Sequence, residues 1–222
     1  MAKAVIFDVD GTLVDSVDIH AEAWRDAFAD FGHTFDLKAI RDQIGKGGDQ
    51  LLPVFLSPEE IERDGEKLEE HRGHILKERY LERVRPFPSV PELFRRILDD
   101  GRQVALASSA KDEELQFYKD RAGIAELIHT ETSSSDAERS KPHPDIFQAA
   151  LGRLSGVRPQ DAVVVGDTPY DAEAAAKAGV PTIGLLCGGW TEEKLRDAGC
   201  VAVFKDPADL LARYEQSPIV QD

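Results

Sequence analysis

Residues 5–16 read Val-Ile-Phe-Asp-Val-Asp-Gly-Thr-Leu-Val-Asp-Ser, and this stretch predicts how the rest of the chain is organised. Its first three residues are uncharged β-formers, which favours a short buried strand. Asp8 and Asp10 follow with one residue between them, so an extended chain directs both carboxylates to the same side. Gly11 then permits a sharp turn. An isolated Asp-x-Asp is also compatible with a solvated acidic turn, so the rest of the chain decides whether this is a ligand site.

Composition and charge restrict the class of protein. The chain has 222 residues, enough for an α/β domain with an insert, and its net charge of -15 argues against a nucleic-acid surface. No apolar run approaches the roughly 18 residues that cross a bilayer, and the N-terminus lacks a signal-peptide pattern. We therefore expect a cytoplasmic protein, a monomer or homodimer, that binds no membrane. We expect Cys187 and Cys200 to be reduced thiols.

The order of the expected elements divides the chain into two parts. Residues 17–85 show helical spacing and no strand pattern, with helices expected at about 19–31, 37–43 and 59–80. Beyond residue 86 strands alternate with helices, which indicates a parallel sheet covered on both faces. The predicted fold is a doubly wound, Rossmann-like α/β core, residues 1–16 and 86–222, with an all-helical cap at 17–85. Strands are expected at 103–107, 127–130, 162–165, 181–185 and 201–204, and helices at 90–98, 113–121, 144–154, 172–178, 192–197 and 208–214.

Further polar residues lie near the ends of the expected strands. Ser108 follows the strand at 103–107, and Asp167 follows the one at 162–165, with Asp171 four residues later. Lys141 lies between Ser140 and a proline. Each has a structural alternative, since serine and aspartate also cap helices and most lysines are solvated.

If these residues lie at one edge of the sheet, repulsion among their carboxylates requires a compensating positive charge nearby. Each pair of carboxylates at about 4 Å repels by roughly 4 kcal/mol at an effective dielectric of 20. Convergence of Asp8, Asp10, Asp167 and Asp171 would therefore require positive charge. Lys141 supplies one cation, and Mg²⁺ is a natural second, because it binds few carboxylates and keeps waters.

The four motifs, taken in order, resemble those of the haloacid dehalogenase-like superfamily, most of whose members are magnesium-dependent phosphatases. The likeness runs from residue 5 to about residue 184, and the helical segment matches the placement of the family's cap. It implies a phosphatase that acts on a small phosphorylated metabolite through an aspartyl phosphate on Asp8, with Asp10 as the general acid and base. Ser108 and Lys141 would hold the phosphoryl group. Mg²⁺ would bind Asp8, the Asp10 backbone carbonyl and Asp167, with Asp171 as a direct or indirect ligand.

Five other residues are candidates for contacts with substrate or phosphate. Gly11 and Thr12 belong to the loop after the first motif, and Ser109 follows the second, where we also expect it to cap the next helix. His20 lies on the first cap helix, where it is either part of the site or a surface histidine. Lys46, in the Gly-Lys-Gly-Gly run at 45–48, belongs either to a flexible turn or to a loop that closes over an anionic group.

The chain also resembles phosphosugar mutases of the β-phosphoglucomutase type, which are the main alternative. Two departures favour hydrolysis. Gly166 stands where the mutases have Glu, and the cap loop has Asp49 but no Arg after Lys46, although a bisphosphate would need a cation there. A dehalogenase is disfavoured because Asp10 is present, and a non-enzymatic binding module is the remaining alternative.

Overall fold

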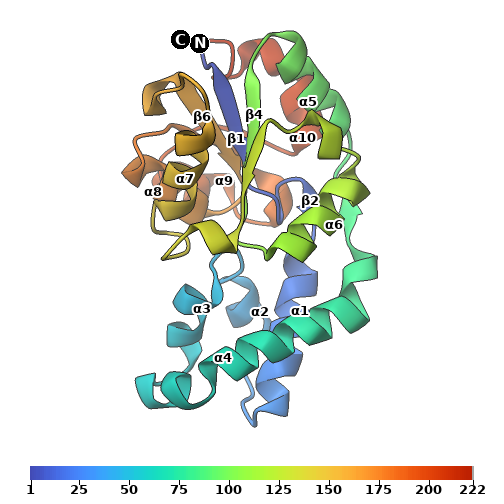
Figure 1. The fold of residues 1–222 in the computed structure, drawn as a ribbon, viewed down its shortest axis with the longest axis vertical. Coiled ribbons are helices and arrows are strands. Elements are labelled where there is room, and N and C mark those ends of the chain that lie inside the picture. The colour runs from blue at the N-terminus through green and yellow to red at the C-terminus, as the bar shows by residue number, and fades with distance from the viewer. Residues whose placement is uncertain (222) are drawn as a thin grey trace.

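The computed structural model describes residues 1–221, and its core is a six-stranded parallel sheet. The strands lie in the order β5-β4-β1-β6-β7-β8, with β1 between β4 and β6 (Figure 1). The predicted doubly wound α/β class is confirmed. The strands are β1 (Ala4–Phe7), β4 (Gln103–Ala107), β5 (Thr130–Thr132), β6 (Ala162–Gly166), β7 (Thr182–Leu185) and β8 (Cys200–Phe204).

Helices cover both faces of the sheet because side chains alternate along each strand. On one face Val5 and Phe7 pack into a core cluster with α5, and the Phe7 ring stacks on Phe94 with centroids 4.7 Å apart. On the other face Ala4 and Ile6 pack against residues of α7 and α8. The core helices are α5 (Val90–Asp99), α6 (Asp112–Ala122), α7 (Asp145–Arg153), α8 (Pro169–Lys177), α9 (Glu192–Asp197) and α10 (Pro207–Ala212).

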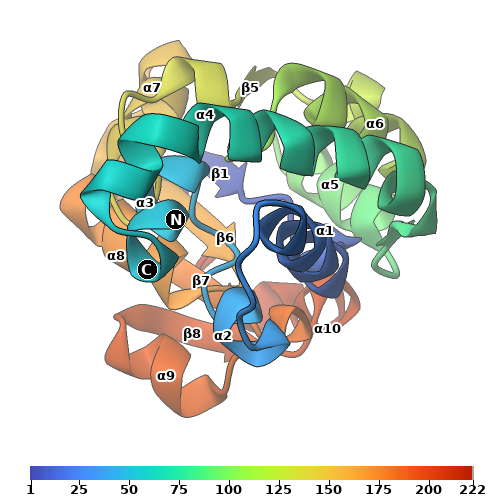
Figure 2. The same cartoon turned by 90° about the horizontal axis from the view of Figure 1, so that it is seen from below.

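The segment between the first two strands of the chain and Pro86 is helical. A two-stranded antiparallel ribbon, β2 (Val14–Asp15) with β3 (Arg85–Pro86), joins it to the core. The helices of this segment lie beyond the carboxyl ends of the core strands (Figures 1 and 2). We propose that this segment is a cap domain with the predicted boundaries 17–85. Its helices are α1 (Val17–Asp30), α2 (Leu37–Arg41), α3 (Gly48–Phe55) and α4 (Pro58–Ile75), and α4 continues into a π-helical turn (Leu76–Tyr80) and a 3₁₀ turn (Leu81–Arg83).

Three local expectations were wrong. The strand expected at 127–130 is a 3₁₀ turn (Ala125–Leu127) followed by β5, because the Leu127 N–H bonds to Ile124 O. Helix α8 begins at Pro169 rather than residue 172, since Thr168 and the third helical residue form a capping box. The sequence analysis predicted no helix at α3, because Pro53 lies inside this segment and a proline within a helix usually breaks it.

Two whole-chain expectations concern cysteines and membranes. Cys187 and Cys200 are free thiols. Across residues 1–221, every helix is too short or too polar to cross a membrane.

Candidate active site

The candidate site lies at the carboxyl end of β1. Along the chain β4 and β5 are added on one side of β1, and β6, β7 and β8 on the other. This reversal is the topological switch point at which open α/β sheets bind ligands. Asp8 follows β1, Ser108 follows β4 and Asp167 follows β6. The predicted strand-end residues therefore meet at one edge of the sheet.

Lys141 supplies the cation next to Asp8. Its Nζ donates to Asp8 Oδ1 at 2.5 Å and to the Ala107 carbonyl at 3.2 Å. Asp171 Oδ1 lies 2.8 Å from the same nitrogen and forms an ion pair with it. Burial lowers the pKa of Lys141, but Asp171 and Asp8 raise it overall, so the ammonium stays charged. Burial raises the pKa of Asp8 to about 7, although Lys141 opposes the rise.

Asp8, Asp167 and Asp171 form a buried carboxylate cluster. Each offers one oxygen, and these oxygens lie within 4.8 Å of one another. The Thr12 hydroxyl is 3.1 Å from Asp8 Oδ2 and 3.0 Å from Asp167 Oδ1, so it bridges two members. Burial, with Asp8 and Asp171 nearby, raises the pKa of Asp167 well above its ordinary value. Among residues 1–221, Asp167 Oδ2 is buried and has no hydrogen-bond partner.

The cluster fits a divalent cation. Two glycines border the unpartnered Asp167 oxygen, because a Cβ at Gly11 or Gly188 would overlap Oδ2. Gly11 also has φ +79°, which disfavours other residues. The three carboxylates and the Lys141 ammonium together carry a net charge of -2 when all four groups are ionised. Carboxylate oxygens, excess negative charge and a buried oxygen without a hydrogen-bond partner suit Mg²⁺.

Asp171 also has a structural role. Its Oδ2 accepts from the Thr168 N–H at 3.0 Å and from the Thr168 hydroxyl at 2.7 Å, and its own N–H donates back to that hydroxyl at 3.1 Å. The N-terminus of α8 thereby fixes the carboxylate. A Cβ at Gly166 would lie 2.6 Å from the Asp171 Cβ, so this backbone leaves no room there for the glutamate of the mutases.

The Asp10 carboxylate lies apart from the cluster. Ser16 Oγ donates to its Oδ1 at 2.6 Å, and His20 Nε2 lies 2.8 Å from the same oxygen. Burial raises the pKa of Asp10, but His20 and Ser16 lower it overall. The structure therefore places His20 in the site, and Tyr118 OH fixes its ring at 3.0 Å. A metal contact through the Asp10 backbone stays a prediction.

A cavity of about 250 Å³ lies between the core and the cap helices. Asp8, Asp10 and His20 line it. Ser108 and Ser109 line it as well. The Ser108 hydroxyl accepts from the Ala110 N–H at 3.0 Å, which leaves its proton for another acceptor. Ser109 does not cap α6 as expected, because the N-cap position is Lys111, without a side-chain cap.

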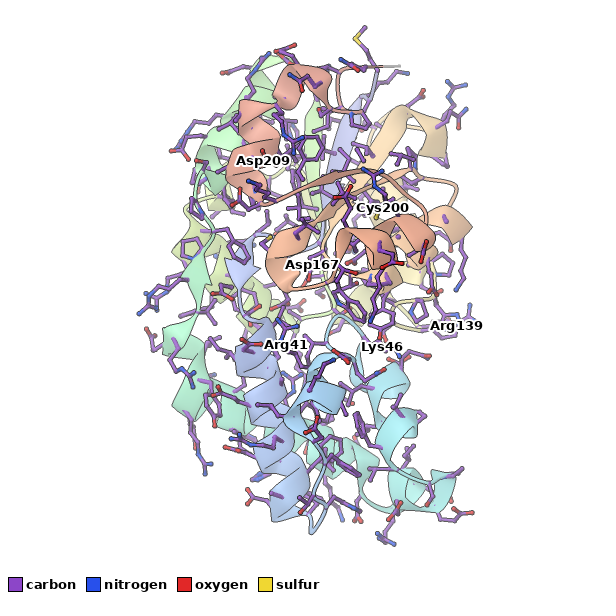
Figure 3. All side chains as sticks on the ribbon, turned by 180° about the vertical axis from the view of Figure 1, so that it is seen from behind. Arg41, Lys46, Arg139, Asp167, Cys200 and Asp209 are labelled. Carbon is purple, nitrogen blue, oxygen red and sulfur yellow. The ribbon has the colours of Figure 1, made fainter. Side chains whose placement is uncertain are left out.

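The cap loop at 45–49 rests on the core. The Gly47 N–H donates to Ser140 Oγ at 2.8 Å, and Asp49 accepts from both the N–H and the hydroxyl of Ser140. Lys46 lines the cavity, but its ammonium bonds to Gln43 at 2.6 Å and lies 4.5 Å from the Tyr170 ring centroid. Figure 3 shows Lys46 where the cap meets the core. Asp49 thus holds the cap loop against the core through Ser140.

Three residues of the site were missed by the sequence analysis. Arg72 of α4 and Glu114 of α6 both line the cavity, with Arg72 Nη1 3.6 Å from Glu114 Oε1 and 3.5 Å from His20 Nδ1. Tyr118 is the third, through its contact with His20. The cap loop has no arginine after Lys46, as its sequence shows, and the guanidinium that lines the cavity comes from α4.

Comparison with known proteins identifies the family. A family model described as haloacid dehalogenase-like hydrolase matches residues 2–179. The chain belongs to the haloacid dehalogenase-like hydrolases. It is 28% identical over 210 residues to the phosphorylated carbohydrates phosphatase of Thermotoga maritima, covering 94% of this chain and 96% of that protein. It is 27% identical to the phosphoglycolate phosphatase of Rhodospirillum rubrum, covering 95% and 90%.

A solved hydrolase from Pseudomonas syringae has the same fold over nearly the whole chain. It superposes with a TM-score of 0.87 at 26% identity, covering 99% of both chains. The predicted family and the predicted hydrolase of the phosphatase type are thereby confirmed.

Proposed function

We propose that the chain is a Mg²⁺-dependent phosphatase that hydrolyses phosphomonoesters of small metabolites through a phosphorylated Asp8. One observation carries the proposal. The Asp8 carboxylate lines a cavity between the core and the cap, with the Lys141 ammonium at 2.5 Å and a second carboxylate, Asp10, in the same cavity. A nucleophile, a cation beside it and a separate proton donor are the groups that phosphoryl transfer needs.

Both chemical steps follow from these positions. A carboxylate oxygen of Asp8 attacks phosphorus and the bond from phosphorus to the ester oxygen breaks. Asp10, which takes up a proton when the anionic substrate binds, gives that proton to the leaving oxygen. A water molecule then attacks phosphorus, Asp10 takes up its proton, and the bond to Asp8 breaks to release inorganic phosphate. His20 and Ser16 orient Asp10 throughout.

The remaining residues position the phosphoryl group. Lys141 neutralises Asp8 during attack, and the free proton of Ser108 is available to a phosphate oxygen. Asp8 and Asp167 would hold Mg²⁺, with Asp171 beside them, and Thr12 fixes the first two carboxylates. When bound, Mg²⁺ would supply positive charge for the phosphate oxygens.

The cap keeps bulk water from the reacting atoms. Ser140 holds the cap loop through Gly47 and Asp49, and Tyr170 OH donates to the Asp42 carbonyl at 2.6 Å. These contacts hold the cap against the core beside the cavity, which suits chemistry on a small substrate that enters when the cap moves away.

The experiment is phosphate release from p-nitrophenyl phosphate with Mg²⁺. We expect turnover by the wild type, none by Asp8→Asn, and wild-type turnover by Asp99→Asn, a matched control at an exposed position remote from the site. Excess chelator should abolish turnover, and Ca²⁺ should inhibit it, because the larger ion binds more oxygens. Release by a verified, undeamidated Asp8→Asn protein would refute the role of Asp8.

A further inference from the structure

The end of the cap helix α2 contacts both core segments that border the buried carboxylate cluster. Arg41, the last residue of α2, donates from Nη2 to the Gly188 carbonyl at 3.2 Å. The carbonyl of the next residue, Asp42, accepts from Tyr170 OH at 2.6 Å. The first contact reaches the 3₁₀ turn Leu186–Gly188, and the second reaches the first turn of α8. The proposed chemistry gives neither Arg41 nor Tyr170 a role in the metal site.

The turn that Arg41 contacts forms a wall of the metal site. A Cβ at Gly188 would lie 1.6 Å from Asp167 Oδ2, so the backbone of this turn lies against that carboxylate oxygen. The same oxygen has no hydrogen-bond partner among the described residues. Arg41 also packs on the following residue, since a Cβ at Gly189 would lie 2.6 Å from Arg41 Nη2. From the cap, Arg41 therefore fixes a backbone that limits where Asp167 can lie.

A second path leads from the cap to Asp171. Thr168 holds the Asp171 carboxylate with its N–H at 3.0 Å and with its hydroxyl at 2.7 Å. Gly45 of the cap loop packs on the same threonine, because a Cβ at Gly45 would lie 2.9 Å from Thr168 Cγ2. Tyr170 directly precedes Asp171 and binds the cap through its hydroxyl. The cap thus braces both residues that set the position of Asp171.

We propose that Tyr170 is a positioning residue for the metal site, and that through it closure of the cap and binding of Mg²⁺ strengthen each other. The inference rests on the proposed function, because it takes Mg²⁺ to bind at Asp8 and Asp167. With the cap closed, the segments beside Asp167 and Asp171 are already held in place, so less conformational freedom is lost when these carboxylates meet a cation. The linkage is reciprocal, because a closed cap that improves the binding of Mg²⁺ is itself stabilised by Mg²⁺.

Tyr170→Phe tests the inference without a change in charge. The variant keeps the ring and loses only the hydroxyl that donates to the Asp42 carbonyl. We expect the Kd for Mg²⁺, titrated into substrate-free protein by calorimetry, to rise by about threefold to tenfold, the effect of losing one hydrogen bond. Tyr80→Phe is the matched control, because the Tyr80 hydroxyl donates to Asp26 at 2.7 Å within the cap. The control should keep the wild-type Kd.

Hydrogen exchange measures the same coupling from the cap. The Gly47 N–H donates to Ser140 Oγ and the Ser140 N–H donates to Asp49, so both amides are bonded across the contact between cap and core. We expect Mg²⁺ alone to slow their exchange in the wild type by about fivefold or more, and by less in Tyr170→Phe. Arg41→Lys keeps the charge at the other contact and should also weaken the effect. A variant that is merely less stable exchanges faster both with and without Mg²⁺, so the ratio of the two rates reports the coupling.

The outcomes separate this inference from the proposed function. If the wild type binds Mg²⁺ but Tyr170→Phe binds it as tightly, the coupling through Tyr170 is wrong and the phosphatase stands. The same conclusion follows if Mg²⁺ leaves the exchange of the Gly47 and Ser140 amides unchanged in the wild type. If the wild type binds no Mg²⁺, the metal dependence in the proposed function is overturned, and the inference with it.

Discussion

The ammonium of Lys141 lies between the carboxylates of Asp8 and Asp171, at 2.5 Å from one and 2.8 Å from the other. All three side chains are buried. One cation thus compensates two anions, one at the end of β1 and the other in the first turn of α8. Without it, Asp8, Asp167 and Asp171 would place only negative charge in a buried site, and their mutual repulsion would oppose both folding and attack on a phosphate.

Lys141→Met should therefore impair activity and stability together. Loss of the charge beside the developing transition state costs about 10²–10³-fold in kcat. Removal of one partner from a buried ion pair costs about 3–5 kcal/mol of unfolding free energy. Phosphate release and urea denaturation measure the two effects, with exposed Lys205→Met as the control. A variant with wild-type kcat would show that Lys141 is structural only.

Gly188→Ala should block the metal site without touching the nucleophile. The added methyl group would overlap the unpartnered Asp167 oxygen, so we expect the stabilisation by Mg²⁺ in a thermal melt to be lost. The matched control is Gly152→Ala within α7, where a Cβ meets no atom within 4 Å. That variant should gain about 0.5–1 kcal/mol of stability and keep its response to Mg²⁺. An unchanged Mg²⁺ response in Gly188→Ala would place the metal elsewhere.

Stabilisation by Mg²⁺ should increase with pH. Burial raises the pKa of Asp8 to about 7 in the metal-free fold, and the pKa of Asp167 is raised too. Between about pH 4 and pH 7 the folded chain therefore holds protons that the unfolded chain has released, so the metal-free protein loses stability as pH rises. To bind at acidic pH, Mg²⁺ must displace the protons held by these carboxylates, whereas at basic pH the carboxylates are already ionised. The rise in Tm on adding Mg²⁺ should thus be larger at about pH 8 than at about pH 5.5, and equal rises would contradict this.

The sequence predicted the core of the site because backbone rules place its residues. Asp8, Ser108 and Asp167 each follow a run of apolar β-formers, and parallel strands bring their carboxyl ends to one edge. Lys141 lies on no strand, and its position was expected only from the family resemblance. Its three oxygen partners come from β1, β4 and α8, which no local pattern reveals.

The cap side of the site was harder to predict, because it depends on how two helices from distant parts of the chain pack. One signal was present. The buried positions of α4 are Gly65, Leu68, Arg72 and Ile75, so an arginine lies on the buried, otherwise apolar face of this charge-rich helix. Glu114 and Tyr118 similarly lie one turn apart on the buried side of α6. A charged residue on the buried face of a helix needs a partner of opposite charge or a hydrogen bond, but helical periodicity does not identify that partner.

Chemical trapping of the phosphorylated enzyme tests the central claim most directly. Borohydride reduces an aspartyl phosphate to homoserine, so the wild type quenched during turnover of p-nitrophenyl phosphate and then reduced should contain homoserine at position 8. The peptide that spans residues 4–25 can be sequenced by mass spectrometry for this purpose. We predict homoserine at Asp8 only when substrate and Mg²⁺ are both present, and none at Asp10. Homoserine at another aspartate, or steady turnover with unmodified Asp8 throughout, would contradict the account.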